Sequence, residues 1–341
     1  LRQLHGYPYF DALDACAQTV MASFNSWNGL KLHGYEELLT DILKQDMQFD
    51  GFVVGDWNGH GQVDGCSNSK CAQSFNAGVD MFMVPENWKA LYKNTVKQVK
   101  DGEISKERLD DAVKRILTVK QQLGMFEGRV PNQTKYSEVG LQKNREIARR
   151  AVRESLVLIK NNNATLPIKD QQKILVIGDS ADSLKIQTGG WTLDWQGANN
   201  TNSDFPGSVT FLQALKEYEN LEITHKNSLS NLDLNNNYDL VIVAYGEEPY
   251  AEGIGDRKNL FYRDSKTLNT LKRLKRNGNK VVSIFFTGRP LWTNEFINLS
   301  DAFVVAWLPG TESRGMTDVL VANEDGSVNY DFQGKLPFSW P

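Results

Sequence analysis

The sequence predicts an α/β protein in two parts, and three observations indicate this fold class. Short apolar runs of strand length recur along the chain, and stretches with helical periodicity separate several of them. A stretch rich in Pro, Asn, Gln, Lys and Ser at 126–140 lacks periodicity and divides the chain. The 341 residues exceed the usual size of one compact domain. We therefore expect two domains joined by a linker.

The first part alternates strand and helix patterns. We expect strands at 18–24, 51–55 and 79–84, and helices at 35–47, 72–77 and 88–100. Ser105 is of a residue type that caps helices, and the apolar positions after it trace one helix face until Gly124. This order of elements is typical of a parallel sheet.

The second part follows the same rhythm. We expect strands at 156–159, 173–178, 238–244, 280–286 and 302–307, and a helix at 265–275. Strands separated by helices favour a layered α/β sandwich.

Composition and charge exclude several classes of protein. Hydrophobic residues make up 40% of the chain and charged residues 23%, which argues against disorder because packed cores can form. The formal net charge of −4 leaves no basic excess to bind nucleic acid. No apolar run reaches the roughly 20 residues that span a bilayer. We therefore expect neither nucleic acid nor a membrane as a partner.

Two of the three cysteines lie close together. Cys66 and Cys71 are five residues apart in a loop rich in Gly, Asn and Ser. A disulfide between them would indicate an oxidising compartment, and two free thiols are the alternative; we prefer the disulfide. We expect no metal site, because no histidine or second cysteine pair stands nearby to complete four ligands. Cys16 has no partner among them.

Asp56 directly follows the apolar strand pattern at 52–54. Enzymes with α/β folds place catalytic groups at the carboxyl ends of parallel strands. Gly55 allows close backbone approach, and Trp57 adds a flat apolar face beside the carboxylate. This combination is typical of sugar sites, where C–H groups meet rings and hydroxyls meet acids. The alternative is a strand-end aspartate that caps the next helix.

Two loops in the second part add to this site. The loop at 189–197 holds Trp191 and Trp195 between glycines, which indicates that these rings pack on something. The loop at 246–256 follows a buried strand and gathers four carboxylates. Taken alone, such an acidic loop is more often structural or solvated surface than a site.

Gly-Phe-Val-Val-Gly-Asp-Trp at 51–57 is the first of several motifs that run in the right order along nearly the whole chain. Together they resemble glycoside hydrolase family 3, and the segment at 51–57 resembles the nucleophile motif of that family. The loops at 191–197 and 247–256 are most similar to the branch that contains plant and marine bacterial exo-β-glucanases. Further matching segments are those at 77–85, 108–117, 155–161, 288–290 and 307–312.

The resemblance implies a (β/α)8 TIM barrel followed by an α/β sandwich, with the active site between them. Residues 1–125 would be the C-terminal half of the barrel, 126–140 the linker, and 141–341 a truncated sandwich domain. A barrel of this type takes about 250 residues. We therefore expect the N-terminal half of the barrel to be missing, and this chain to be inactive unless a companion segment completes the sugar pocket.

The resemblance also implies an activity. The enzyme would be a retaining, exo-acting β-D-glucan glucohydrolase or β-glucosidase that releases glucose from non-reducing ends of β-glucan oligosaccharides or β-glucosides, with no cofactor. Asp56 would be the nucleophile and Glu252 the acid/base, and Glu247 is the alternative because other branches use the first glutamate of this loop. A retaining mechanism requires two carboxyl groups roughly 5–5.5 Å apart.

Four residues are candidates for binding substrate. Trp57 and Trp195 resemble the aromatic pair that sandwiches the sugar. Phe24 stands where the branch often has Tyr, and Met83 lies on the last barrel strand; core packing is the alternative for both. We expect two histidines to be uninvolved in chemistry: His33 as a satisfied structural histidine, and His60 as a solvated loop residue.

Three other interpretations stay open. The first is a different family 3 specificity, β-xylosidase or β-N-acetylglucosaminidase. The second is a non-catalytic carbohydrate-binding fragment. The third is a nucleotide-binding module, suggested by Gly178 after the 173–177 strand, which is weak evidence without a Gly-x-Gly-x-x-Gly motif. The cysteine pair and the polymeric substrate that the resemblance implies favour a secreted or periplasmic location.

Overall fold

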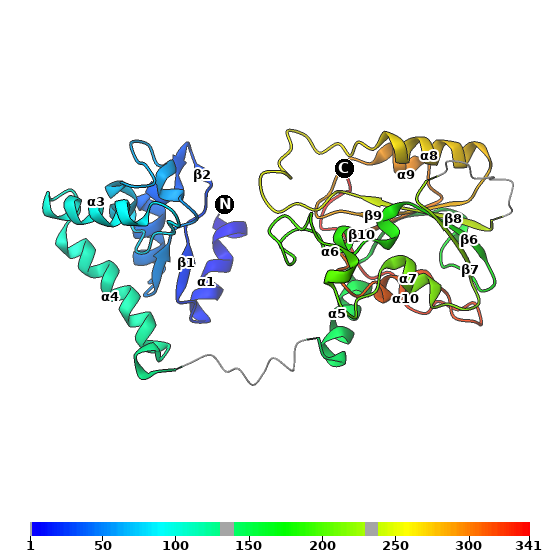
Figure 1. Cartoon of the computed structure of the whole chain (residues 1–341), viewed down its shortest axis with the longest axis horizontal. Helices are drawn as coiled ribbons and strands as arrows, with labels where there is room; N and C mark the ends of the chain where they lie inside the picture. Colours follow the sequence, from blue (N-terminus) through cyan, green and yellow to red (C-terminus); the bar gives the residue numbers. More distant parts are fainter. Residues whose placement is uncertain (1, 130–139, 229–237) are drawn as a thin grey trace. The chain divides into compact units, whose positions relative to one another are not determined.

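The computed structural model describes residues 2–129, 140–228 and 238–341. It divides the chain into two compact units, Leu1–Gln133 and Thr134–Pro341 (Figure 1). The predicted linker at 126–140 lies largely outside the described residues, because 130–139 are not among them.

The first unit is built around short parallel strands. β1 (Thr19–Met21) pairs with β4 (Phe52–Val54), and Val54 forms a parallel bridge with Met81 on the other side. β4 therefore lies between two parallel neighbours. The other elements, with η marking a 3-10 or π-helix, are η1 (Arg2–Gly6), α1 (Tyr7–Asp14), β2 (Ser26–Trp27), β3 (Leu30–Lys31), η2 (Leu32–Gly34), η3 (Glu37–Asp46), η4 (Gly59–Gln62), α2 (Ala72–Ala77), α3 (Trp88–Lys100), α4 (Lys106–Gln122) and η5 (Met125–Glu127).

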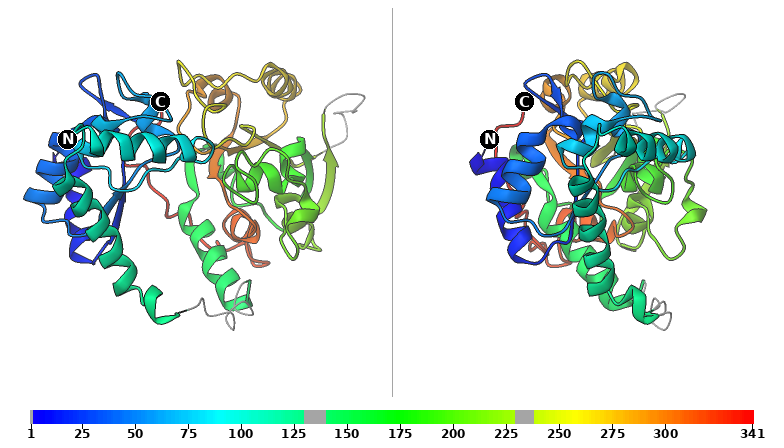
Figure 2. Two further views of the ribbon diagram at one scale, coloured as in Figure 1. Left: turned by 60° about the vertical axis from the view of Figure 1, so that its left-hand side comes forward. Right: turned by 90° about the vertical axis from the view of Figure 1, so that its left-hand side faces the viewer.

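Local signals in the sequence explain the helix ends in this unit. Oγ of Ser105 accepts the backbone N–H of Arg108 at 3.1 Å, so Ser105 caps α4 as predicted. Gly124 follows α4 with a φ of +70°, a conformation that glycine adopts at little cost. The views in Figures 1 and 2 show α3 and α4 joined end to end in a V.

The predicted strand at 79–84 is wrong, apart from the bridge of Met81. The reason is that a side chain replaces the strand ladder at this point. Oδ2 of Asp80 accepts the N–H of Val53 at 2.7 Å, and the carbonyl of Val53 accepts the N–H groups of both Asp80 and Met81. These contacts satisfy the backbone without extending the sheet.

Six strands among the described residues form the sheet of the second unit. Their order is β5–β10–β9–β8–β6–β7, and all neighbours are parallel except β5 and β10. The strands are β5 (Val157–Asn161), β6 (Lys173–Ile177), β7 (Glu222–Lys226), β8 (Leu240–Gly246), β9 (Val281–Phe286) and β10 (Ala302–Trp307). The α-helices among the described residues are α5 (Gln142–Ser155), α6 (Leu184–Thr188), α7 (Phe211–Lys216), α8 (Ser265–Arg276), α9 (Asn294–Asn298) and α10 (Arg314–Leu320).

Helices cover both faces of this sheet, so the expected α/β class is confirmed. α5, α7 and α10 pack on one face, and α8 and α9 pack on the other, as Figures 1 and 2 show. Successive residues of the central strands point to opposite cores: Ile242 belongs to one and Val243 to the other. Burial on both faces explains why these strands are apolar throughout.

The order of the strands brings the loops of interest to one edge of the sheet. β6 comes first among the parallel strands, and the chain then adds β7 on one side of it and β8 on the other. The carboxyl ends of β8 and β9 are neighbours, because Gly246 pairs with Phe286. Ligands of α/β proteins bind beyond the carboxyl ends of such strands.

Candidate active site

Asp56 lies in a turn that begins where β4 ends. Its side chain is half-buried, and Oδ1 accepts the backbone N–H of Trp57 at 2.7 Å. The backbone N–H of Asp56 donates to Nε2 of His33 at 2.8 Å. The structure therefore places this carboxylate at the carboxyl end of a parallel strand, where the sequence predicts it.

His33 is buried against this turn, with 1% of its surface exposed. Gly59 lies so close that an added Cβ would be 2.3 Å from Nε2 of His33. Burial lowers the pKa of His33, and the nearby Asp56 carboxylate opposes this shift only in part. The expectation of a satisfied, buried histidine is confirmed, and its partner is the backbone of the predicted nucleophile.

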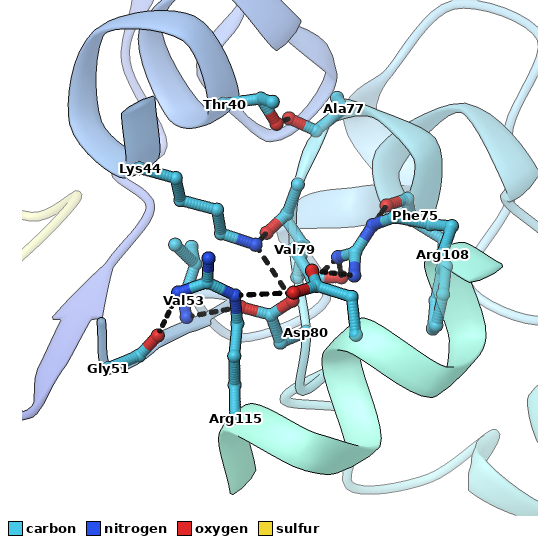
Figure 3. A network of polar contacts seen from close by, with 12 residues as sticks. Thr40, Lys44, Gly51, Val53, Phe75, Ala77, Val79, Asp80, Arg108 and Arg115 are labelled. Atoms are coloured by element: carbon cyan, nitrogen blue, oxygen red, sulfur yellow. Dashed lines mark hydrogen bonds and ion pairs between the residues drawn. The ribbon is translucent and has the colours of Figure 1, made fainter. Parts of the chain in front are cut away.

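A largely buried cluster of charges holds β4, the strand that leads to Asp56 (Figure 3). We call Lys44, Asp80, Arg108, Asp111 and Arg115 the Asp80 cluster. The Asp80 carboxylate accepts Lys44 Nζ at 2.8 Å, Arg108 Nη2 at 2.6 Å and the N–H of Val53 at 2.7 Å. Charge-assisted bonds of this kind are short and strong.

The rest of the Asp80 cluster extends this support to the start of β4. Asp111 binds both Arg108 and Arg115, and Nη1 of Arg115 donates to the carbonyls of Phe49 and Gly51 at 2.8 Å each. Burial lowers the pKa of Lys44 to about 8, although the Asp80 carboxylate opposes this shift. β4 is therefore anchored at its middle by Asp80 and just before its first residue by Arg115.

The loop after the turn is closed by a disulfide. Cys66 and Cys71 are bonded, so the preferred prediction is confirmed. The expectation that His60 is solvated is wrong: His60 is 1% exposed, lies 3.0 Å from the carbonyl of Asn68, and packs edge-on against Phe82. The short disulfide loop folds back over η4, and this covers the His60 ring.

The candidate sugar-binding residues of the first unit differ in exposure. Trp57 is 53% exposed, as a binding platform requires. Phe24 is half-buried, with its ring 6.1 Å from that of His33. Met83 is half-buried, and its carbonyl accepts the N–H of Asn58 at 2.9 Å. Trp57 therefore lies in the turn that holds Asp56, and Met83 bonds to that turn. Phe24 lies beside His33, which itself bonds to Asp56.

The second unit presents the acidic loop directly after β8, and Glu247 is its most constrained carboxylate. The Glu247 side chain is 9% exposed. It accepts Nη2 of Arg289 at 2.8 Å, Oγ1 of Thr287 at 2.7 Å and Nη1 of Arg257 at 3.4 Å. Arg289 also lies over the Tyr250 ring, 4.3 Å from its centroid. Glu247 is therefore held as an ion-paired, hydrogen-bonded anion.

Glu252 has the opposite surroundings. Its side chain is exposed, and its carboxylate forms no hydrogen bond or ion pair with any residue that the structure describes. Its backbone is nevertheless fixed, because Nε2 of Gln196 donates to the Glu252 carbonyl at 2.9 Å and Oε1 of Gln196 accepts the N–H of Ala251 at 2.8 Å. An anchored backbone with an unengaged carboxyl suits a group that must give and take a proton.

Gln196 also joins the two predicted loops of this unit. It follows Trp195 in the chain, and Trp195 is 54% exposed. The ring centroids of Trp195 and Trp191 lie 6.3 Å apart. At Gly190 an added Cβ would lie 2.0 Å from the carbonyl of Tyr250, so the loops touch through their backbones. The structure thus brings the tryptophan loop and the acidic loop together, as a shared binding edge requires.

A cavity of about 470 Å³ opens beside the acidic loop. Its lining includes Glu247, Tyr250 and Arg289, together with Arg257 and Arg263. Its volume is in the range of small-molecule sites. Carboxylates, guanidinium groups and a tyrosine give it many hydrogen-bonding groups for a polar ligand.

Sequence reasoning misses two residues of this site. Gln196 escapes prediction because a glutamine in a loop carries no local signal of the bond it makes 56 residues away. Arg289 belongs to a segment that resembles the family, at 288–290, but the pattern does not reveal its partner Glu247. Among the described residues, no three His, Cys, Asp or Glu side chains gather as a metal site. In that same part of the chain, no helix is both long and apolar enough to cross a membrane.

Comparison with known protein families gives two matches that together span most of the chain. Residues 1–119 match the model described as glycosyl hydrolase family 3 N terminal domain. Residues 156–341 match the model described as glycosyl hydrolase family 3 C-terminal domain.

Known proteins resemble the chain over nearly its whole length. It is 31% identical to a lysosomal β-glucosidase of Dictyostelium discoideum, over 96% of this chain and 42% of that protein. A solved variant of the exo-1,3/1,4-β-glucanase of a Pseudoalteromonas species is 48% identical, with a TM-score of 0.93 over all of this chain and 56% of that one. The β-glucosidase of Listeria innocua, solved with glucose and, as a mutant, with laminaribiose, is 28% identical, with a TM-score of 0.78 over 92% of this chain and 44% of that one. This chain thus spans about half the length of these relatives.

Proposed function

The chain belongs to glycoside hydrolase family 3, and on that premise we propose that it is part of a retaining, exo-acting β-D-glucan glucohydrolase. Its substrates would be β-glucan oligosaccharides or β-glucosides, cleaved at the non-reducing end to release glucose. The relatives support this substrate class, because they are an exo-1,3/1,4-β-glucanase and β-glucosidases, one of them solved with laminaribiose.

One observation carries the assignment of the catalytic pair. Glu247 is ion-paired to Arg289, whereas the carboxylate of Glu252 is unengaged by described residues. An acid/base must exchange a proton in each turnover, and an arginine partner stabilises the ionised form that cannot donate one. This contrast supports Glu252 as the acid/base, and the place of Asp56 at the carboxyl end of the parallel strand β4 supports Asp56 as the nucleophile.

The proposed reaction has two displacements. An oxygen of Asp56 attacks the anomeric carbon while the bond to the leaving oxygen breaks, and Glu252 gives that oxygen its proton. Glu252 then takes a proton from water, the water oxygen attacks the anomeric carbon, and the bond to Asp56 breaks. The configuration at the anomeric carbon is retained because it is inverted twice.

Exposed aromatic faces support the proposed sugar contacts. Trp57 and Trp195 are both about half-exposed, and a ring in that state can stack on the C–H face of a pyranose. Phe24 and Met83 would line the pocket beside Asp56. Stacking fixes the plane of the sugar without fixing each hydroxyl, so several linkage types would be accepted.

We further propose that the first unit is the C-terminal half of a (β/α)8 barrel and the second an α/β sandwich. The succession of β1, β4 and the Met81 bridge, all parallel, supports the barrel part. The outer edge of β1 pairs with no other described strand, so a preceding strand could add there. The missing barrel half would be the partner that completes the sugar pocket.

We also propose a secreted or periplasmic location for the chain. The Cys66–Cys71 disulfide supports it, because such bonds persist in oxidising compartments. A relative that is a lysosomal β-glucosidase is in keeping with a location outside the cytosol.

The test is covalent trapping with a 2-deoxy-2-fluoro-β-glucoside that carries a good leaving group. The chain is incubated alone and together with the co-expressed amino-terminal barrel segment of the Pseudoalteromonas glucanase, and the labelled peptide is sequenced by mass spectrometry. We expect the label on Asp56, with the companion segment present and not without it. A label on another residue would overturn the assignment of the nucleophile.

Two variants sharpen this test. Asp56→Asn should abolish labelling, while Asp50→Asn, an exposed aspartate six residues earlier, should label as the unmodified chain does. Labelling of the chain alone would refute the need for a companion segment and leave the catalytic roles intact.

A further inference from the structure

We propose that His33 is a positioning residue for Asp56: its Nε2 accepts the Asp56 backbone N–H and thereby sets the direction of the carboxylate. The proposal rests on the proposed function of Asp56 as nucleophile. Three features of the described residues carry it, namely the hydrogen bonding of the turn, the fit of the ring and the charge state that the contact requires.

Hydrogen bonding in the turn shows what His33 adds. The other four residues of the turn at 55–59 donate their backbone N–H groups locally. Gly55 and Asn58 donate to the carbonyls of Met81 and Met83, whereas Trp57 and Gly59 donate to Oδ1 and the carbonyl of Asp56. The N–H of Asp56 instead donates to a side chain, His33 Nε2, at 2.8 Å. The residue that bears the carboxylate is thus fixed by a group 23 positions away in the chain.

The fit of the ring leaves it little freedom to move. An added Cβ at Gly59 would lie 2.3 Å from both Cε1 and Nε2 of His33, and one at Gly55 would lie 3.5 Å from Cδ2. The contact at Gly55 would be an ordinary van der Waals one, so it is glycine at position 59 that allows the turn to close on the imidazole. A ring held in this way acts as a rigid template, which positions a reacting group better than a mobile side chain.

The charge state follows from the contact. Nε2 can accept a hydrogen bond only when it carries no proton, so the proton of a neutral ring lies on Nδ1. The backbone of Ser23 is hydrogen-bonded to His33, and Asp56, His60 and Lys31 are the charged or titratable groups that act on it. Burial is the largest influence and lowers the pKa of His33, so the ring stays neutral near pH 7 and keeps its acceptor.

The contact can be tested directly by NMR on the full 341-residue chain, with no substrate. In a perdeuterated sample labelled with ¹⁵N, an N–H···N bond transmits a scalar coupling between the Asp56 amide nitrogen and His33 Nε2. We expect this coupling and an Nε2 chemical shift typical of an unprotonated nitrogen. A protonated Nε2, or no coupling to the Asp56 amide, would overturn the proposal.

The functional consequence is tested by the rate of covalent labelling in the trapping experiment. His33→Met introduces an apolar side chain of similar size and removes the acceptor, whereas the side-chain oxygen of His33→Gln can replace Nε2. We expect the maximal labelling rate of His33→Met to fall roughly 10- to 100-fold, with little change in the half-saturating concentration, and His33→Gln to recover most of the rate. A purely structural role would not lower the maximal labelling rate while leaving the half-saturating concentration unchanged, and His33→Gln would not restore the rate.

His60→Gln is the matched control, because His60 is equally buried but lies against the Asn68 carbonyl rather than the nucleophile. It should label at the unmodified rate if its melting temperature is unchanged. Equal rates in folded His33→Met and the unmodified chain would contradict the proposal. If the label appears on a residue other than Asp56 while the N–H···N coupling is present, the proposed function fails and the contact stands.

Discussion

Nη2 of Arg289 lies 2.8 Å from Oε1 of Glu247, and this ion pair joins the loops that follow two neighbouring parallel strands, β9 and β8. Glu252, five residues further along the same loop as Glu247, has a carboxylate that forms no bond with described residues. The same loop therefore holds one glutamate suited to structure and one suited to proton transfer.

We expect the two glutamates to respond differently to the same substitution. Glu252→Gln should lower kcat for aryl β-glucosides at least about 100-fold, because the proposed proton donor is lost, and leave the melting temperature unchanged. Glu247→Gln should reduce the free energy of unfolding by about 3 kcal/mol, because it leaves Arg289 without its anionic partner. Urea unfolding of both variants, and steady-state kinetics of both with the companion barrel segment present, measure this. A stable Glu247→Gln variant with the larger catalytic loss would reverse the assignment.

The Asp80 cluster predicts a particular dependence of stability on pH. Burial lowers the pKa of Lys44 from 10.5 to about 8, so the folded state binds fewer protons than the unfolded state between these two pH values. Stability from this group is therefore smallest below pH 8 and rises toward pH 10.5. Between those limits the unmodified chain should gain about 3 kcal/mol of unfolding free energy relative to Lys44→Met.

The measurement is urea unfolding at stepwise pH for both proteins. Lys100→Met, at an exposed lysine of α3, is the control and should follow the unmodified chain throughout. A constant difference between the unmodified chain and Lys44→Met across this range would show that Lys44 titrates as it does in water.

The disulfide should stabilise the loop that covers His60. Replacing both Cys66 and Cys71 by Ser should lower the free energy of unfolding by about 2 kcal/mol, because the open loop gains conformational freedom in the unfolded state. Cys16→Ser is the matched control, since Cys16 is free and exposed, and it should leave stability unchanged. Unfolding curves with and without reductant measure the effect of the disulfide, because reductant should destabilise the unmodified chain and not the double variant. Equal stability of the double variant and the unmodified chain without reductant would contradict this role.

Two tryptophans of equal exposure allow a test of sugar stacking. Trp57, beside Asp56, is 53% exposed, and Trp88, at the start of α3, is 54% exposed. With the companion barrel segment present, Trp57→Ala should raise KM for laminaribiose roughly 3- to 10-fold through the loss of the ring face, while Trp88→Ala should not change it. Equal changes in KM for the two variants would argue against a specific sugar-binding role of Trp57.

Much of the fold follows from local pattern, and the exceptions have physical reasons. The apolar strands of the second unit are predictable because burial on both faces makes each of them continuously hydrophobic. β7 escapes prediction because it is an edge strand with largely polar, half-exposed residues. The segment at 79–84 carries the apolar pattern of a strand, but the Asp80 carboxylate takes the Val53 amide that a ladder would use.

The chain sequence by itself determined the α/β class, the position of Asp56 at a strand end, the capped helix α4 and the short spacing that the disulfide bridges. These features depend on residues close together in the chain, so periodicity and spacing reveal them. Only the tertiary structure decided which glutamate is paired, what holds Asp56, and that His60 is buried. Those outcomes depend on contacts between residues far apart in sequence, such as His33 with Asp56 and Glu247 with Arg289, and no local pattern encodes the partner.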